Sequence, residues 1–181
     1  AANPRATNAM GQLIGWKESG DFDATAMQWN HLVLAGDPAN ERPEAKGNIK
    51  GDIFGCPDGL MFDARGVLWI QTDAHSSEMN KGEFKNIGNN QMLACDLATG
   101  EIRRFLTGPV NCEITGSTMA PDGCTLFINI QHPGESPTDR SDPDQPNKFS
   151  SWPQNQFGGA GNRPRSSTVA IRRNDGGLIG T

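Results

Sequence analysis

Residues 55–73 read GCPDGLMFDARGVLWIQTD, and this stretch decides the fold of the chain. Leu60-Met-Phe62 predicts a short outgoing strand, and Val67-Leu-Trp-Ile70 predicts an apolar return strand that is buried on both faces. Between them, Asp63-Ala-Arg-Gly66 predicts a tight turn, because glycine accepts the positive φ that such turns require. The stretch therefore predicts a β-hairpin inside a layered β structure.

The same design returns in residues 113–129, which read EITGSTMAPDGCTLFIN. Gly123 takes the place of Gly66 in the turn, and the apolar strand Leu126-Phe-Ile-Asn-Ile130 follows it. Residues 91–106, between the two copies, predict a hairpin of their own. One period then contains four strands, which is the unit of a β-propeller blade.

Weaker hairpin patterns occur towards both ends of the chain. Residues 11–18 pair with residues 27–34 in one of them, and residues 167–172 pair with residues 178–179 in the other. No stretch has the apolar spacing of a long amphipathic helix. The sequence predicts an all-β fold: a partial β-propeller of about three four-stranded antiparallel blades with long loops.

The length of 181 residues supplies fewer blades than the roughly 4–8 of a closed propeller. We therefore expect residues 1–181 to form a single domain that is the C-terminal fragment of a larger β-propeller. Residues 134–165 are expected to be a long loop insertion, anchored by Trp152 and Phe157. Since open blades leave strand edges unpaired, either the remaining N-terminal half of the propeller or self-association is expected to cover them.

Composition excludes several classes of function. The net charge is −5 and the basic residues are dispersed, which argues against a nucleic-acid partner. No apolar run reaches the roughly 18 residues of a membrane span. The four cysteines show no Cys-x-x-Cys spacing of a zinc site.

Polar residues gather at the strand ends away from the two turns: Asp58, Asp73, Glu113 and Asn129. Their oxygen atoms suit calcium, which takes about 6–8 such ligands, or another hard cation. The alternative is that these residues only decorate strand ends. His132 ends an apolar strand before a proline, where it could bind metal or phosphate or form a structural hydrogen bond.

Six motifs, in this order along the chain, resemble the C-terminal part of PhoX-type alkaline phosphatases: residues 56–63, 68–73, 89–93, 105–109, 113–116 and 127–135. The resemblance implies a six-bladed propeller that hydrolyses phosphomonoesters with iron and calcium ions. It also implies export by the twin-arginine route, and hence a periplasmic or secreted protein. The family's metal-binding carboxylates map to Glu113, Asp58 and Asp73, with Glu113 as the candidate catalytic residue. His132 and Asn129 are the candidates for binding the phosphate ester substrate.

The chain departs from the family pattern in one respect. The Cys-Ala-Gly-Gly and Cys-Glu-Glu stretches that supply iron ligands in the family's N-terminal half do not occur in these 181 residues. We therefore expect an incomplete site and an isolated chain with little or no activity. Two other functions stay open: a calcium-dependent lactonase of the gluconolactonase type, and a non-catalytic propeller that binds a partner or completes a ring.

Overall fold

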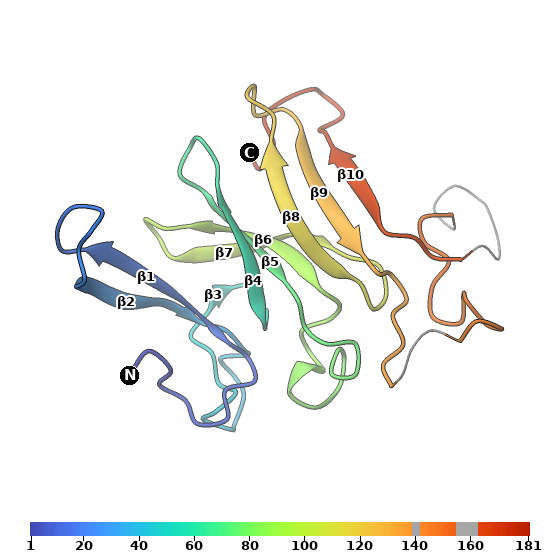
Figure 1. The fold of residues 1–181 in the computed structure, drawn as a ribbon, viewed down its shortest axis with the longest axis horizontal. Coiled ribbons are helices and arrows are strands. Elements are labelled where there is room, and N and C mark those ends of the chain that lie inside the picture. The colour runs from blue at the N-terminus through green and yellow to red at the C-terminus, as the bar shows by residue number, and fades with distance from the viewer. Residues whose placement is uncertain (139–141, 155–162) are drawn as a thin grey trace.

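The computed structural model describes residues 1–138, 142–154 and 163–181, and this part of the chain is all-β. Its strands form three sheets that lie side by side in a fan (Figure 1). The described residues include a short 3₁₀ turn, η1 (Gly82–Phe84). None of the described helices is long and apolar enough to cross a membrane. The predicted fold class is confirmed.

The middle sheet grows from the stretch that opens the sequence analysis. Its antiparallel strands run in chain order: β4 (Pro57–Phe62), β5 (Leu68–Thr72), β6 (Gln91–Asp96) and β7 (Glu101–Thr107). As predicted from its apolar sequence, every residue of β5 is buried. A two-residue strand, β3 (Lys50–Gly51), pairs in parallel with β7 and has no counterpart in the sequence prediction.

The second copy of the hairpin consists of β8 (Glu113–Met119) and β9 (Leu126–Gln131). Both turns contain the same backbone hydrogen bond: Gly66 N donates to Asp63 O at 3.0 Å, and Gly123 N donates to Ala120 O at 2.9 Å. Gly66 has φ +82° and Gly123 has φ +69°, the left-handed region that favours glycine. The repeat read from the sequence is therefore a structural repeat.

The outer strands complete the two flanking sheets. At one side of the fan, β1 (Gln12–Glu18) and β2 (Met27–Leu34) form a two-stranded ribbon. At the other, β10 (Ser167–Ile171) pairs with β9 in a three-stranded sheet. The described residues thus contain one complete four-stranded antiparallel blade and two sheets with fewer strands.

The predicted return strand at residues 178–179 does not form. Ile179 is buried in the core and its N–H donates to Gly123 O at 2.9 Å, so the tail closes over the β8–β9 turn. Arg173 and Asp175 form an ion pair at 2.6 Å within the preceding turn. An apolar pair of residues becomes a strand only where a strand edge runs alongside, and the tail meets a turn instead.

Two apolar clusters hold the sheets together. One lies between the β1–β2 ribbon and the middle sheet and includes Phe54, Ile70 and Leu93. The other lies between the middle sheet and β8–β10 and is centred on Trp69, which is fully buried and packs edge-on against Phe105 at 5.0 Å. Such layers of sheet, core and sheet are how adjacent propeller blades stack.

The segment predicted as a long loop is only partly described. Its described residues, 134–138, 142–154 and 163–165, contain no strand, and Trp152 packs against the second apolar cluster as predicted. Phe157 lies outside the described residues. The far end of the β1–β2 ribbon leaves Trp16 65% exposed and Phe22 fully exposed.

Candidate metal and phosphate site

The hairpins β4–β5 and β8–β9 point in the same direction. Their turns border one hollow, lined by residues 61–65 and 117–123, and β4 and β5 both contact β8 along their length. Gln71 Nε2 donates to Ser117 Oγ at 3.0 Å across this contact. Because the turns lie together, the opposite ends of the two hairpins also lie together. We call this the open end of the hairpins.

Asp58 and Asp73 stand at the open end of the first hairpin. Asp58 lies near the start of β4, and Asp73 directly follows β5, where its N–H donates to Cys56 O at 3.0 Å. Burial raises the pKa of the Asp73 carboxyl, and the negative charges of Asp58 and Glu135 raise it further. The Asp73 carboxyl is therefore within electrostatic range of Asp58 on the first hairpin and of Glu135, which follows the second hairpin.

Glu113 lies at the open end of the second hairpin. It is the first residue of β8, opposite Gln131, and only 8% of it is exposed. Burial raises the pKa of the Glu113 carboxyl, as do the charges of Asp73 and Asp58. Its Oε2 accepts a hydrogen bond from Gln131 Nε2 at 2.6 Å. The structure thus brings together the three acids that the sequence singled out, which belong to two different sheets.

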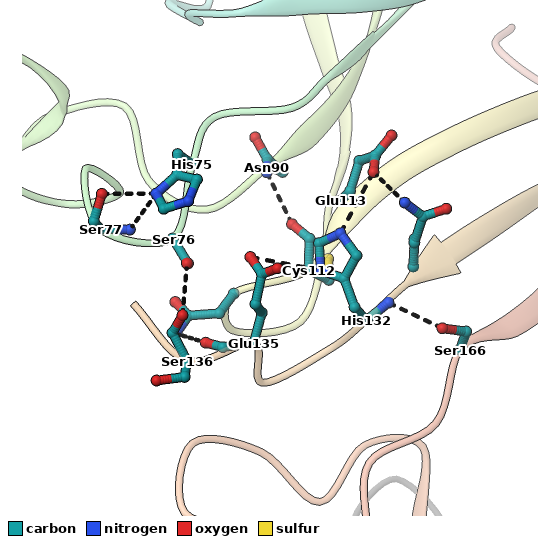
Figure 2. Close-up of polar contacts among 12 residues, drawn as sticks. His75, Ser76, Ser77, Asn90, Cys112, Glu113, His132, Glu135, Ser136 and Ser166 are labelled. Carbon is teal, nitrogen blue, oxygen red and sulfur yellow. Dashed lines mark hydrogen bonds and ion pairs between the residues drawn. The ribbon is translucent and has the colours of Figure 1, made fainter. Parts of the chain in front are cut away.

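His132 lies between Glu113 and Glu135 (Figure 2). Its Nε2 is 3.5 Å from Glu113 Oε2, and its Nδ1 is 3.9 Å from Glu135 Oε2. That Nδ1 atom is buried and has no hydrogen-bond partner among the described residues. His132 also has φ +37°, and backbone strain in a residue other than glycine often accompanies a functional role.

Sequence reasoning missed Glu135 as a member of this group. It follows the strand by four residues, and its place is set by the turn rather than by a strand pattern: Glu135 N donates to His132 O at 3.1 Å, and Asn111 Nδ2 donates to Glu135 O at 2.8 Å. The charge of Glu135 acts on Asp73, which shows that the two are near each other. We call Asp58, Asp73, Glu113 and Glu135 the acidic cluster.

Asn129 is placed differently from the acids. Its side chain lies on the exposed face of β9, where Oδ1 accepts a hydrogen bond from Thr168 Oγ1 at 2.7 Å on β10. It stands two residues before Gln131, further from the open end. No hydrogen bond within the described residues joins it to the acidic cluster, and its role in substrate binding stays a prediction.

A buried amide, Asn90, connects the backbones that carry the acids. Its Oδ1 accepts from Thr72 Oγ1 at 3.0 Å and from Ala74 N at 2.7 Å. Its Nδ2 donates to Ala74 O at 3.0 Å. The same atom donates to Cys112 O at 2.8 Å (Figure 2). Thr72 and Ala74 flank Asp73, and Cys112 precedes Glu113. Sequence patterns do not reveal this link, because it depends on contacts between segments far apart in the chain.

The donor chemistry at the open end fits a hard cation. Burial and the neighbouring carboxylates raise the pKa of both Asp73 and Glu113, and a bound cation would relieve this crowding of like charge. Burial raises the pKa of the Cys112 thiol to about 12, so this neighbour of Glu113 is a protonated thiol at neutral pH rather than a thiolate ligand. Within the described residues, however, no three His, Cys, Asp or Glu side chains converge closely enough to hold a metal ion by themselves.

Comparisons with known proteins agree with this architecture. A sequence profile described as Alkaline phosphatase PhoX matches residues 1–134. The solved structure of Pseudomonas fluorescens PhoX in complex with vanadate, a transition state analogue, is similar to the chain with a TM-score of 0.80 and 44% sequence identity. That match covers 98% of this chain and 29% of the P. fluorescens chain, so this chain spans less than a third of its relative. No curated protein matches the chain. The profile match over most of its length and the shared structure show that the chain belongs to the PhoX alkaline phosphatase family.

Proposed function

We propose that the chain is part of a metal-dependent phosphatase that hydrolyses phosphomonoesters. One observation carries the proposal: at the open end of the hairpins, the carboxylates of Asp58 and Asp73 in the middle sheet raise the pKa of buried Glu113 in the neighbouring sheet. Membership of the PhoX family supports assigning phosphate-ester chemistry to this cluster. It also favours the phosphatase over a propeller lactonase built on similar acids.

In this proposal the carboxylates of Glu113, Asp73 and Asp58 hold the cations, with calcium and iron expected from the family resemblance. Bound cations supply positive charge that binds the phosphoryl oxygens and stabilises the transition state. Glu113 is assigned the catalytic role because its carboxylate would hold the cations that act on the reacting phosphoryl group. His132, whose Nε2 lies 3.5 Å from Glu113 Oε2, is the first candidate for contacting the phosphate ester. Asn129 remains the second candidate for contacting the ester.

We also propose that this chain holds only part of the site. It spans 29% of the length of P. fluorescens PhoX, and the described residues contain no complete set of metal ligands. The remainder of a longer polypeptide would cover the exposed β1–β2 ribbon and supply the missing ligands. Self-association with a second copy of the chain is the alternative. The 181-residue chain alone should then be nearly inactive. A periplasmic or secreted location belongs to the same proposal.

Hydrolysis of p-nitrophenyl phosphate with added iron and calcium tests the function. We expect turnover by the longer polypeptide that contains this chain and little turnover by the chain alone. Glu113→Gln should reduce kcat by at least about 100-fold, which is the scale expected when charge at a reacting centre is lost. The matched control is Glu101→Gln, which removes a carboxylate at the start of β7 that pairs with Arg103. Equal activity in the two variants would favour the scaffold function.

Metal content separates the two enzymatic functions. Iron together with calcium in the purified protein supports the phosphatase, whereas calcium or zinc alone, with lactone hydrolysis, supports the lactonase. Each measurement uses the same preparation, so a folding defect would appear in both.

A further inference from the structure

A cavity of about 810 Å³ lies beside the acidic cluster. Its lining includes Glu135, which belongs to that cluster, and the side chains of His132 and His75. This volume is within the range of about 300–1,000 Å³ that small-molecule sites occupy. Three stretches form its walls: residues 132–138 after β9, residues 142–146, and residues 163–166 before β10. The cavity therefore begins where the proposed phosphate site ends.

Proline dominates the walls. The lining includes five proline residues, which have fixed φ angles and no backbone N–H to donate: Pro133, Pro137, Pro143, Pro146 and Pro164. These prolines place conformationally restricted apolar patches among the polar lining residues, and such patches suit the organic part of a ligand better than a phosphate.

Hydrogen bonds fix the walls to the body of the protein. Gly134 N donates to Val110 O at 2.8 Å, and His132 N donates to Ser166 Oγ at 3.0 Å, so the segment before β10 is joined to the segment after β9. Ser76 Oγ donates to Ser136 O at 3.3 Å, which joins the wall to the loop after Asp73. Two of the three wall segments are therefore held in place by hydrogen bonds.

Within residues 1–138, 142–154 and 163–181, the acids of the lining have polar partners and its arginine does not. Asp142 Oδ1 accepts from Asp144 N at 3.0 Å, and Glu135 lies 3.9 Å from the His132 ring. Arg163 is the only lysine or arginine among the described lining residues. Its guanidinium has no hydrogen bond or ion pair within the described part of the chain. An unpaired guanidinium beside acids that already have partners is available to an anionic ligand, which its planar fork recognises well.

We infer that this cavity receives the alcohol moiety of the phosphomonoester, and that Arg163 makes it favour alcohols that carry a second negative charge, such as a carboxylate. The inference rests on the proposed phosphatase function and names the substrate class for it. The phosphoryl group lies at the acidic cluster, the carbon chain lies against the prolines, and the distal anion contacts Arg163. Arg163 is a specificity residue, and the chemistry at phosphorus does not involve it.

Two substrates of similar size test the inference in the longer, active polypeptide. 3-Phosphoglycerate carries a carboxylate, and glycerol 3-phosphate does not. Arg163→Gln should raise KM for 3-phosphoglycerate about 10-fold, which is the effect of losing about 1.4 kcal/mol of binding. KM for glycerol 3-phosphate should stay within about twofold, as should kcat for both substrates, because the arginine acts on binding only. The control is Arg172→Gln, which removes an arginine just after β10 that does not line the cavity.

A second readout does not depend on turnover. Phenylglyoxal modifies exposed arginines, and Arg163 is exposed. 3-Phosphoglycerate should protect Arg163, identified by peptide mass spectrometry, and glycerol 3-phosphate should protect it much less. Equal KM changes for both substrates, or equal modification of Arg163 with either ligand, would overturn the inference while leaving the phosphatase function intact. Selective protection without any phosphate hydrolysis would support the anion-binding cavity and refute the proposed function.

Discussion

Replacing Asn90 with alanine removes four buried hydrogen bonds at once. The side chain is 2% exposed and joins Thr72, Ala74 and Cys112. Thr72 and Ala74 flank Asp73, and Cys112 precedes Glu113. The substitution therefore removes hydrogen bonds that hold the backbone next to both acids in place. We expect loss of stability together with loss of order in the acidic cluster.

The magnitude follows from the bonds. Each neutral hydrogen bond contributes about 1 kcal/mol net, and a buried group left without a partner costs about 1–3 kcal/mol. Asn90→Ala leaves the Ala74 N–H and the Cys112 carbonyl without their partner, so we expect a loss of about 3–5 kcal/mol. Since domains are stable by about 5–15 kcal/mol, this is a large fraction of the total. Asn90→Asp keeps the volume but sets an oxygen against two carbonyls, and it should cost a similar amount.

Urea unfolding at neutral pH, followed by tryptophan fluorescence, measures the effect. The adjacent variant Asn89→Ala is the matched control: Asn89 is half-buried and makes two side-chain hydrogen bonds, at 3.0 and 3.3 Å, so it should lose about 1 kcal/mol. If Asn90→Ala and Asn89→Ala lower the free energy of unfolding equally, or if Asn90→Asp is as stable as the wild type, the assigned role of Asn90 is wrong.

Two further predictions concern single carboxylates. The Asp63 side chain is 3% exposed and accepts hydrogen bonds from Arg65 and the Trp69 indole. Asp63→Ala should therefore lower the free energy of unfolding, measured by heat or urea, by about 2–3 kcal/mol. The control is Asp175→Ala, which removes an exposed carboxylate and should change that free energy little. Burial alone would raise the pKa of Asp63, but these hydrogen bonds lower it. The stabilisation by Asp63 is therefore present above the ordinary pKa near 3.8 and is lost as pH falls through the lower folded value. The difference in free energy of unfolding between wild type and Asp63→Ala should accordingly shrink in acid. Asp73 and Glu113 have the opposite shift, so the metal-free protein should lose stability as pH rises from the ordinary carboxyl pKa through their raised values. Asp73→Asn should flatten that part of the pH profile of unfolding, and an unchanged profile would contradict the charge repulsion described here.

Much of the fold could be predicted because its signals are local. A glycine at positive φ marks each turn, and a strand without polar residues, such as Val67–Ile70, marks the buried centre of a sheet. The two-residue strand β3 has no such signal, since it exists only because β7 runs beside it. The strand predicted at residues 178–179 was wrong for the opposite reason. Its sequence pattern suits a strand, but no strand edge among the described residues runs beside it.

The site was predictable to the extent that it follows the repeat. Asp58, Asp73 and Glu113 stand at equivalent ends of two similar hairpins, and the structure places these ends together. Glu135 and Asn90 could not be found in this way, because a turn positions one and contacts between distant segments define the other. Asn129 follows the same alternation as Gln131 but lies further from the open end, where it bonds to Thr168.

The central claim is that carboxylates from two sheets hold one cation together. Calcium titration by isothermal calorimetry, with wild type, Asp73→Asn, Glu113→Gln and the double variant, tests it most directly in the polypeptide that contains this chain. We predict that each single substitution weakens calcium binding at least about 10-fold and that the two effects fall well short of adding, because both residues serve the same ion. Unchanged affinity in either single variant, or effects that simply add, would show that Asp73 and Glu113 do not share a cation.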